Sequence, residues 1–382
     1  MNRGAVAEIN LSAIAYNLRS IKKIVKNKPV IAVVKADAYG HSAVEVSKKL
    51  IKEGVSYLAV AFSSEAIALR KAGIKSPIIV LFERSDIKDF FDFKLIPVIY
   101  DMNTALAISA EAKKRQTMIN IHAKIDTGMG RLGLRGKNIL SDLIRISEME
   151  GIKLNGLLSH FSEADLLDKS YAVLQLDRFN RIREALSKKL RRKIFSHIAN
   201  SAAVLAFEDA YLDAVRPGLI LYGYSPIIQN TEYRNQKLET DKSSSVKLRP
   251  AMKVTTKILC IRNLPSKTPI SYSRTFITKR ASRIGVLPIG YADGYGRLFS
   301  NNADVLVRGI RAPVAGRVCM DLTMVDLTDT NGVKENDEVV IMGKQGKESI
   351  TAYELAHKAN TIPYEVLISL GSKSEKIYVE AD

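Results

Sequence analysis

The chain has 382 residues, of which 46% are hydrophobic, and a formal net charge of +18. This length suits a large domain followed by a smaller one, and the hydrophobic content excludes global disorder. The two cysteines, Cys260 and Cys319, exclude a disulfide framework and lack the spacing of metal ligands, so we expect no metal site. No apolar run is long enough to span a membrane, and the N-terminal residues lack the apolar core of a signal peptide, so we expect a cytoplasmic location.

A basic charge of this size is one signature of a nucleic-acid-binding protein. Lys and Arg are nevertheless spread through segments such as 183–193 and 234–249, where they alternate with acidic residues. The sequence has no zinc-finger spacing, ribonucleoprotein motif or ladder of basic and aromatic residues. We interpret the charge as a solvated basic surface, and we expect neither a nucleic-acid nor a membrane partner.

Short apolar runs alternate with helical patterns from Pro29 to Val215. The apolar runs cover 30–34, 57–61, 78–82, 96–100, 119–125, 154–159, 193–197 and 212–215. The helical patterns cover 11–26 before the first run and then 42–53, 63–73, 85–92, 103–114, 136–149, 170–190 and 201–209. Strands that alternate with helices pair in parallel, and eight strands in about 200 residues favour a closed (β/α)8 barrel over an open doubly wound sheet.

A polar stretch without a clear period follows the barrel pattern. After it, apolar runs separated by Gly, Pro, Asn and Asp predict strands, at 252–260, 284–288, 304–308, 322–327 and 338–342. Only 351–358 has a helical pattern in this part of the chain. The fold class we predict is α/β, with an N-terminal (β/α)8 barrel over 9–230, a linker over 231–249 and a mostly-β C-terminal domain over 250–382. We expect residues 1–8 to pair with the second domain.

The first predicted strand ends at Lys35, inside the segment PVIAVVKADAYGHS (29–42). A lysine in this place is either a solvated charge or an amine held over a pocket, and Lys35 alone favours the solvated charge. Tyr39 follows after three small or short residues, and such a turn lets a ligand approach the backbone. An amine beside apolar surface loses its proton more easily, and a neutral lysine attacks an aldehyde. The segment is therefore a candidate site for Schiff-base chemistry.

Polar side chains also lie at the ends of the later strands of the predicted barrel or just after them. They are Lys124, Asp126 and Arg131 at the fifth strand, His160 at the sixth, His197, Asn200 and Ser201 at the seventh, and Arg216, Gly218 and Leu219 at the eighth. Function in such barrels lies at the C-terminal ends of the strands, and the loops after strands seven and eight commonly hold phosphate. A lysine amine, a phosphate cradle at Ser201 and Gly218, and an arginine are what pyridoxal phosphate requires. Ser201 taken alone is better explained as a helix N-cap.

Nine sequence motifs then identify a family. They are AVVKADAYGHS (32–42), IDTGMGRLG (125–133), LLSHFSEAD (157–165), HIANSAA (197–203), VRPGLILYG (215–223), ISYSRTF (270–276), LPIGYADGYGR (287–297), APVAGRVCMDLTMVDLT (312–328) and TIPYEVLISLG (361–371). In this order they resemble the bacterial alanine racemases, which are fold-type III pyridoxal-phosphate enzymes. The resemblance covers nearly the whole chain, and it implies interconversion of L- and D-alanine to supply D-alanine for peptidoglycan.

The resemblance implies two catalytic bases, Lys35 and Tyr272. Lys35 would also bind the cofactor aldehyde. Racemisation removes a proton from one face of Cα and returns one to the other face, which two opposed bases can do. In the family the tyrosine comes from the second subunit, so the resemblance implies a homodimer with shared active sites. Ser273 departs from the glycine that commonly follows this tyrosine.

The resemblance also assigns the binding residues. Arg216 would contact the pyridine nitrogen with support from His160, and the phosphate would lie among Tyr39, Asn200, Ser201, Gly218, Leu219 and Tyr364. Arg131 would bind the substrate carboxylate together with Met320 of the other subunit, because a guanidinium suits a carboxylate. Lys124 matches a position where a carbamylated lysine orients that arginine. Tyr291 and Asp321 would shape the substrate entry.

Four alternatives stay open at this point. A serine racemase or a broad-specificity racemase has the same fold, although Tyr291 and Met320 favour a small substrate. A decarboxylase of the same fold type should lack the paired ISY and GYADG motifs. A non-catalytic pyridoxal-phosphate carrier is a lone barrel, without a second domain that carries Tyr272. A basic nucleic-acid-binding protein is the most distant alternative.

Overall fold

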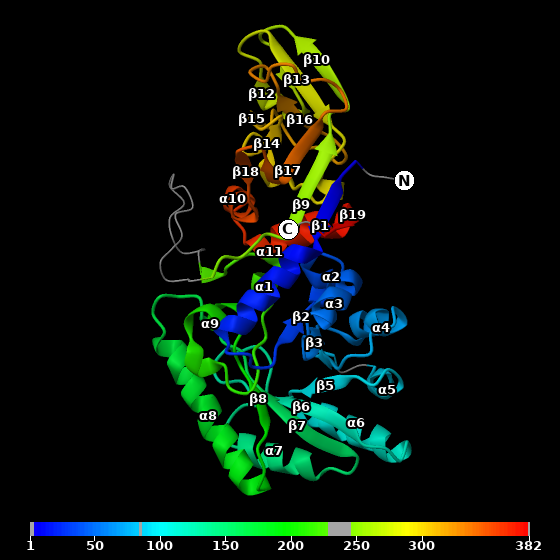
Figure 1. Ribbon diagram of the computed structural model, residues 1–382, viewed down its shortest axis with the longest axis vertical. Helices are drawn as coiled ribbons and strands as arrows, with labels where there is room; N and C mark the ends of the chain where they lie inside the picture. The colour runs from blue at the N-terminus through cyan, green and yellow to red at the C-terminus, as the bar shows by residue number, and fades with distance from the viewer. Residues whose placement is uncertain (1–3, 84–85, 228–245, 381–382) are drawn as a thin grey trace. The chain divides into compact units, whose positions relative to one another are not determined.

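The computed structural model of the chain describes residues 4–83, 86–227 and 246–380. The chain forms two compact units (Figure 1). The barrel unit comprises 14–38 and 43–249, and the strand-rich unit comprises 1–13, 39–42 and 250–382. Most of the predicted linker over 231–249 lies outside the described residues.

Parallel strands form the centre of the barrel unit. In the described part of the chain, seven strands pair side by side in chain order: β2 (Ile31–Val33), β3 (Tyr57–Val60), β4 (Ile78–Val80), β5 (Ile96–Ile99), β6 (Ile119–Lys124), β7 (Ile152–Leu158) and β8 (Phe195–His197). Every residue of β2 and β4 is buried, because helices cover one face of the sheet and side chains fill the barrel interior on the other. This burial explains why the strands read as continuous apolar runs rather than as alternating ones.

The eighth position of the barrel is reduced to single parallel bridges, which join residues 214 and 215 to β8 and to the residue before β2. The Ile31 N–H donates to the Val215 carbonyl at 2.9 Å, so the last segment closes the sheet onto the first strand. The predicted (β/α)8 barrel is therefore confirmed. The strand expected at 212–215 is shorter than predicted because Leu212 has a φ of 47° and Pro217 has no N–H to donate.

Helices alternate with the barrel strands. They are α1 (Leu11–Ile24), α2 (Lys35–Tyr39), α3 (Ala43–Lys52), α4 (Ser63–Lys71), α5 (Ile87–Asp92), α6 (Met102–Lys114), α7 (Ile139–Glu148), α8 (Ser170–Leu190) and α9 (Ser201–Ala206). In α6, the Asp101 side chain accepts a hydrogen bond from the Thr104 N–H at 2.7 Å, and Ala105, Ile108 and Ala112 form the buried face. None of the described helices has both the length and the apolar character that a bilayer crossing requires.

The strand-rich unit is built on a mixed sheet. Its main order is β15 (Ile310–Pro313), β14 (Asp304–Val307), β17 (Glu338–Gln345), β9 (Met252–Lys257), β1 (Val6–Asn10) and β19 (Glu375–Val379), and β18 (Glu348–Ile350) pairs with β17. A second sheet has the order β10 (Cys260–Leu264), β13 (Ser282–Leu287) and β16 (Thr323–Asp326), and β11 (Pro269–Ile270) pairs with β12 (Phe276–Ile277). The N-terminal strand β1 therefore lies between β9 and β19, antiparallel to the first and parallel to the second.

The strand-rich unit contains two longer helices within the described residues, and this differs from the prediction. The first, α10 (Ala352–Lys358), matches the predicted pattern at 351–358. The second, α11 (Pro363–Lys373), contradicts the expectation that only one segment after residue 250 is helical. Pro363 occupies the first turn, where its missing N–H costs nothing, and Val366, Leu367 and Leu370 form the buried face.

Candidate active site

Three cationic side chains converge on the ring of Phe82, which directly follows Leu81 beyond the end of β4. The Nζ atoms of Lys35 and Lys124 lie 5.4 and 5.5 Å from the ring centroid, and Cζ of Arg131 lies 5.8 Å from it. Lys35 begins where β2 ends, Lys124 is the last residue of β6, and Arg131 lies in the loop that follows. The barrel therefore brings these predicted site residues together at the C-terminal ends of its strands.

The positive charge of this cluster is only partly offset by the carboxylates of Glu65 and Asp126. No described carboxylate forms an ion pair with Lys35, Lys124 or Arg131. The nearby Asp126 is engaged elsewhere, because one of its oxygens accepts hydrogen bonds from the N–H groups of Gly128 and Met129 at 3.0 and 2.9 Å. Such a site has the charge to hold an anion such as a phosphate or a carboxylate.

Burial and mutual repulsion favour the neutral form of both lysines. The pKa of Lys35 is lowered by burial and then by the charge of Arg131, and Glu65 opposes this shift. The pKa of Lys124 falls to about 8, again through burial first and Arg131 second. A lysine with a lowered pKa has more of the neutral amine, which is the nucleophilic form.

The backbone after Lys35 makes a left-handed turn. Ala36, Asp37 and Ala38 have φ and ψ between 47° and 54°, and Tyr39 has a φ of 56°. This conformation costs non-glycine residues roughly 1–2 kcal/mol each. The sequence pattern predicts a turn of small residues at this point, but it does not indicate that the turn is left-handed. Strain of this kind persists only where the surroundings enforce it.

Glu65 on α4 enforces the turn. One carboxylate oxygen accepts a hydrogen bond from the Ala36 N–H at 2.6 Å, and the other accepts from the N–H groups of Ala61 and Phe62 at 2.7 and 3.2 Å. The carboxylate thus joins the end of β3 to the first residue after Lys35. Charge-assisted hydrogen bonds of this type are stronger than neutral ones.

Replacing Glu65 by glutamine is expected to destabilise the protein by about 1–3 kcal/mol, because the amide turns one acceptor into a donor that faces backbone N–H groups. Urea unfolding measures the change. Glu45→Gln is the matched control, since Glu45 forms an exposed pair with Lys48 on α3. Equal stability of the two variants would contradict the role of Glu65.

Arg216 is buried at the closing edge of the barrel and is 5% exposed. Its Nη1 donates to His197 Nδ1 at 2.6 Å and to the His197 carbonyl at 2.7 Å, and its Nη2 donates to the Ser159 carbonyl at 2.6 Å. Nη2 also lies 3.4 Å from His160 Nδ1. Its Nε makes no hydrogen bond with a described residue. Burial lowers the Arg216 pKa to about 9, so the guanidinium stays charged at neutral pH.

The loops after β8 and after residue 215 also meet. The Gly218 N–H donates to Ser201 Oγ at 2.9 Å, and Leu219 is fully buried next to this contact. Asn200 is the N-cap of α9, where its Oδ1 accepts a hydrogen bond from the Ala203 N–H at 3.0 Å. The two loops predicted to hold phosphate are therefore in direct contact.

Tyr39 and Tyr364 lie together in the strand-rich unit, with ring centroids 5.7 Å apart. Burial, and then the neighbouring Tyr364, raises the pKa of Tyr39, so its hydroxyl remains a protonated donor. The remaining predicted residues of this unit are on exposed loops. Tyr272 is 68% exposed and Met320 54%. Tyr291 and Asp321 are exposed as well.

Backbone and side-chain contacts join these exposed loops. Ser271 Oγ, next to Tyr272, donates to the Arg317 carbonyl at 2.6 Å. The Ala292 N–H, next to Tyr291, donates to the Met320 carbonyl at 3.0 Å. Ser273 has a φ of 59°, which lies in the left-handed region that favours glycine. The loops predicted to form the partner-side wall are therefore held side by side.

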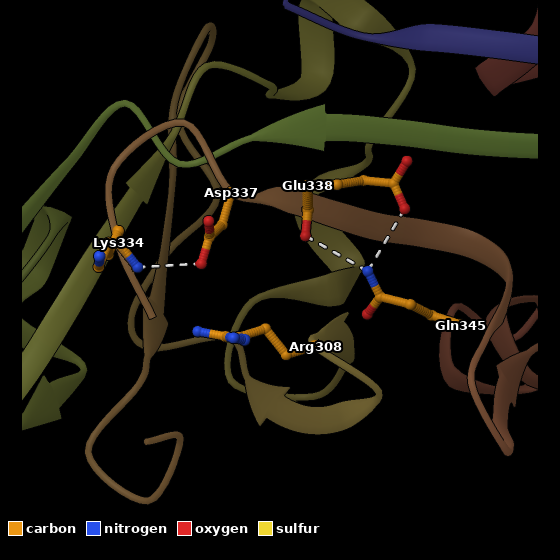
Figure 2. Close-up of a pocket in the computed structure, with 5 residues that line it drawn as sticks. All are labelled: Arg308, Lys334, Asp337, Glu338 and Gln345. Atoms are coloured by element: carbon orange, nitrogen blue, oxygen red, sulfur yellow. Dashed lines mark hydrogen bonds between the residues drawn. The ribbon is translucent and has the colours of Figure 1, made fainter. Parts of the chain in front are cut away.

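Figure 2 shows a polar surface pocket lined by Arg308, Lys334, Asp337, Glu338 and Gln345. Its polar groups are largely paired, since Gln345 Nε2 donates to Glu338 and the Lys334 N–H donates to Asp337 at 3.0 Å. The lining has two cationic and two anionic side chains, and none of the five residues belongs to the predicted site. Among the described residues, no group of three or more His, Cys, Asp or Glu could hold a metal ion.

Sequence reasoning missed three residues of the site. Phe82 is the last residue of the predicted strand 78–82, so the strand-end rule that selected Lys35 would also have found it. Glu65 lies on a helix and gave no sequence signal. His122 lies within β6 and contacts His197, with 2.9 Å between its Nδ1 and His197 Nε2. Only the barrel geometry reveals these last two contacts.

Two family models together match nearly the whole chain. The N-terminal domain of alanine racemase matches residues 9–226, and the C-terminal domain of alanine racemase matches residues 251–378. The chain is 48% identical to an alanine racemase of Thermodesulfovibrio yellowstonii over 99% of both chains. It is 39% identical to an alanine racemase of Clostridium novyi over 98% of this chain and 95% of that one.

Solved structures agree with these relatives. An alanine racemase of Clostridium difficile 630 superposes with a TM-score of 0.89 at 36% identity, over 99% of this chain and 96% of that one. An alanine racemase of Bartonella henselae with covalently bound pyridoxal phosphate has a TM-score of 0.85 at 29% identity, over 98% and 99% of the two chains. The strand-end cluster, the closed barrel and these matches together show that the chain belongs to the alanine racemase family.

Proposed function

We propose that the chain interconverts L- and D-alanine with pyridoxal 5'-phosphate, and that the strand-end cluster of the barrel unit binds the cofactor. The observation that carries this proposal is the cluster of Lys35, Lys124 and Arg131, which form no ion pair with a described carboxylate, near Arg216, whose Nε makes no hydrogen bond with a described residue. The donors fit the cofactor and the substrate, which together carry a phosphate, a carboxylate and an aromatic nitrogen that accepts hydrogen bonds. D-alanine is a building block of peptidoglycan, and we propose that the enzyme supplies it in the cytoplasm.

The residues that would hold the cofactor each match one of its groups. Lys35 would bind its aldehyde carbon, and the N–H of Arg216 Nε would donate to its ring nitrogen, with His160 as support. The phosphate would be held by donors on two loops and two tyrosines, namely Ser201, the Gly218 and Leu219 amides, Tyr39 and Tyr364, with Asn200 fixing the start of α9. When bound, the cofactor supplies an aldehyde that takes up the amino-acid nitrogen and a ring that draws electron density from the Cα–H bond.

Lys35 and Tyr272 would be the two bases. The lowered pKa of Lys35 supports this role, because a base must be neutral to accept a proton. Tyr272 stands on an exposed loop of the strand-rich unit, which supports a site completed by a second copy of the chain. We propose a homodimer in which one copy supplies Lys35 and its partner supplies Tyr272. Tyr291 and Asp321 of the same exposed loops would then line the substrate entry.

Arg131 and the Met320 amide would bind the substrate carboxylate, and Lys124 would orient Arg131 as a carbamate. Carbamate formation joins the neutral amine to CO2 and releases one amine proton to solvent, and the Lys124 pKa of about 8 supplies that amine near neutral pH. A carbamate also replaces a cation that repels Arg131 with an anion that attracts it.

Carbamate occupancy at Lys124 is expected to rise with pH between about 7 and 9 at a fixed CO2 concentration, because the neutral fraction of the amine grows through its pKa. A 13C NMR signal from labelled CO2 measures the occupancy. Lys124→Arg is the control, since it keeps a cation and cannot form the carbamate. A signal that does not depend on pH, or that persists in the control, would contradict the assignment to Lys124.

The position of Phe82 supports a preference for a small substrate. Its ring centroid lies 5.4 Å from Nζ of Lys35, which would act at Cα, and 5.8 Å from Cζ of Arg131, which would hold the carboxylate, so the ring would occupy volume beside the substrate. A serine racemase or a broad-specificity racemase of the same fold would require more room at this position. We propose that Phe82 restricts the enzyme to alanine.

Replacing Phe82 by alanine is expected to raise kcat/KM for serine relative to alanine by about tenfold or more, because a hydrophobic contact that excludes one extra atom has this size. Chiral chromatography of both reactions measures the ratio. Phe62→Ala is the matched control, since the Phe62 ring lies 6.5 Å from Phe82 and is 49% exposed. An unchanged ratio in Phe82→Ala would show that this ring does not set specificity.

One assay tests the proposed function directly. The purified protein is reduced with borohydride, the modified peptide is mapped, and unreduced protein is incubated with each L-amino acid before chiral chromatography. We expect the cofactor on Lys35 and rapid formation of D-alanine. A protein that binds no cofactor and shifts random DNA in a salt-sensitive way would overturn the proposal. Equal rates with serine or lysine would overturn the narrow specificity.

We also propose domain boundaries from the sequence pattern. The barrel domain spans 9–230, the linker 231–249 and the C-terminal domain 250–382, with residues 1–8 belonging to the second domain. The two family matches, which end at 226 and begin at 251, support these boundaries. Limited proteolysis tests them, since cleavage is expected first within 231–249.

A further inference from the structure

Two buried histidines extend the hydrogen-bond network of Arg216 across the barrel. His197 and His122 are 0% and 3% exposed. Arg216 Nη1 lies 2.6 Å from His197 Nδ1, and His197 Nε2 lies 2.9 Å from His122 Nδ1. The three side chains therefore form a continuous hydrogen-bonded series, Arg216–His197–His122, that runs from the guanidinium into the barrel wall.

A glycine makes room for this hydrogen-bonded series. His122 is on β6 and His197 is on β8, so the strand β7 lies between them. Gly156 of β7 pairs with His122, and a Cβ built on Gly156 would lie 2.4 Å from two carbon atoms of the His122 ring. The missing side chain at Gly156 thus lets the imidazole cross β7 and reach His197.

The hydrogen bonds of this series all run in one donor-to-acceptor direction, from Arg216 through His197 to His122. A guanidinium can only donate, so His197 Nδ1 must accept the bond from Arg216. The proton of neutral His197 is then on Nε2, which donates to His122 Nδ1. His122 in turn carries its proton on Nε2. Burial and then the charge of Arg216 lower the pKa of His122 to about 3 and that of His197 well below its usual range, so both stay neutral.

We propose that His122 is a positioning residue, which acts through His197 to hold Arg216 with its Nε directed at the cofactor ring nitrogen. The proposal rests on the proposed contact between Arg216 and the cofactor. A neutral acceptor at His122 fixes the tautomer of His197, and that tautomer is the one that accepts from Arg216. Without this acceptor, His197 Nε2–H is buried without a partner, which costs free energy. The ring lowers that cost by turning or by changing its tautomer.

Two substitutions at His122 separate this role from packing. His122→Phe retains the ring volume and removes the acceptor, whereas His122→Asn loses volume and keeps an oxygen near the position of Nδ1. We expect His122→Phe to weaken cofactor binding about tenfold to a hundredfold, the usual effect of losing a group that orients a binding residue. We expect His122→Asn to bind the cofactor within about threefold of the original protein. The opposite order would show that His122 only fills space, and would overturn the proposal.

Two measurements other than activity test the role of His122. Cofactor affinity is measured by absorption titration, and histidine tautomers are measured by 15N–1H NMR of labelled holoenzyme. We expect the original protein and His122→Asn to show His197 protonated on Nε2. A His197 proton on Nδ1 in the original protein would overturn the proposal. Thermal unfolding of each variant confirms that the compared proteins are folded.

Gly156→Ala is expected to displace the His122 ring without replacing the histidine. The added Cβ overlaps the His122 ring, so cofactor affinity is expected to fall as in His122→Phe although both histidines are present. If this variant does not fold, the two His122 variants still decide the question. Arg216→Ala distinguishes two ways in which the proposal can fail. Unchanged cofactor affinity in Arg216→Ala overturns the proposed function of Arg216 and with it the positioning role of His122. A loss of cofactor affinity in Arg216→Ala with no loss in His122→Phe overturns the positioning role of His122 alone.

Discussion

Replacing Lys35 by alanine is expected to lower the racemisation rate by about a thousandfold or more, because the change removes both the covalent link to the cofactor and one of the two bases. The structure places the Lys35 amine at the mouth of the barrel, beside Phe82 and two other cations. Burial and Arg131 lower its pKa, which increases the fraction of the neutral amine. Steady-state rates in both directions measure the effect.

Lys48→Ala is the control for this substitution, because Lys48 is an exposed lysine on the neighbouring helix α3 that pairs with Glu45. It is expected to retain full activity. Borohydride is expected to attach the cofactor to the control protein and not to Lys35→Ala. Retention of more than about a tenth of the activity in Lys35→Ala would exclude Lys35 as a catalytic base.

Replacing Tyr272 by phenylalanine is expected to lower racemisation by about a hundred- to ten-thousandfold, since the ring remains but the group that exchanges the proton is removed. Cofactor binding is expected to be unchanged, because Tyr272 has no proposed contact with the phosphate or the ring nitrogen. The matched control is Tyr378→Phe, at an exposed tyrosine of β19 that has no proposed role.

Hydrogen exchange in D2O distinguishes a base from a residue that only shapes the site. With one base removed, the remaining base can still exchange the Cα proton of one enantiomer. Tyr272→Phe is therefore expected to exchange the proton of one enantiomer of alanine only. Loss of exchange with both enantiomers would indicate that Tyr272 positions the substrate and does not transfer a proton.

The alternation of apolar runs and helical patterns was sufficient to predict the barrel. The strands β2 and β4 are short and fully buried, so their residues are uniformly apolar, and helices such as α6 have one buried face. The eighth strand was overestimated because a bridge of two residues has no sequence period of its own. The helix α11 was missed because Pro363 resembles a helix breaker, although at the first helical turn proline is compatible with the fold.

The site could be predicted where one positional rule applied. Lys35, Lys124 and Arg216 all follow barrel strands, and that rule places them at one end of the barrel. Glu65 and His122 could not be found in this way. Glu65 binds backbone N–H groups whose orientation depends on a left-handed turn, and His122 reaches its partner only because Gly156 has no side chain. Both roles depend on contacts between strands that no local pattern contains.

We propose that Lys35 and Tyr272 act in one site and come from two copies of the chain. The most direct measurement is complementation: Lys35→Ala and Tyr272→Phe proteins are mixed in equal amounts, dissociated, reassociated and assayed for racemisation. Half of the dimers are then hybrids, and each hybrid has one site with both bases intact, so the mixture is expected to recover about a quarter of the original activity. A mixture no more active than the two separate variants would show that both groups come from the same chain, and would contradict the shared site.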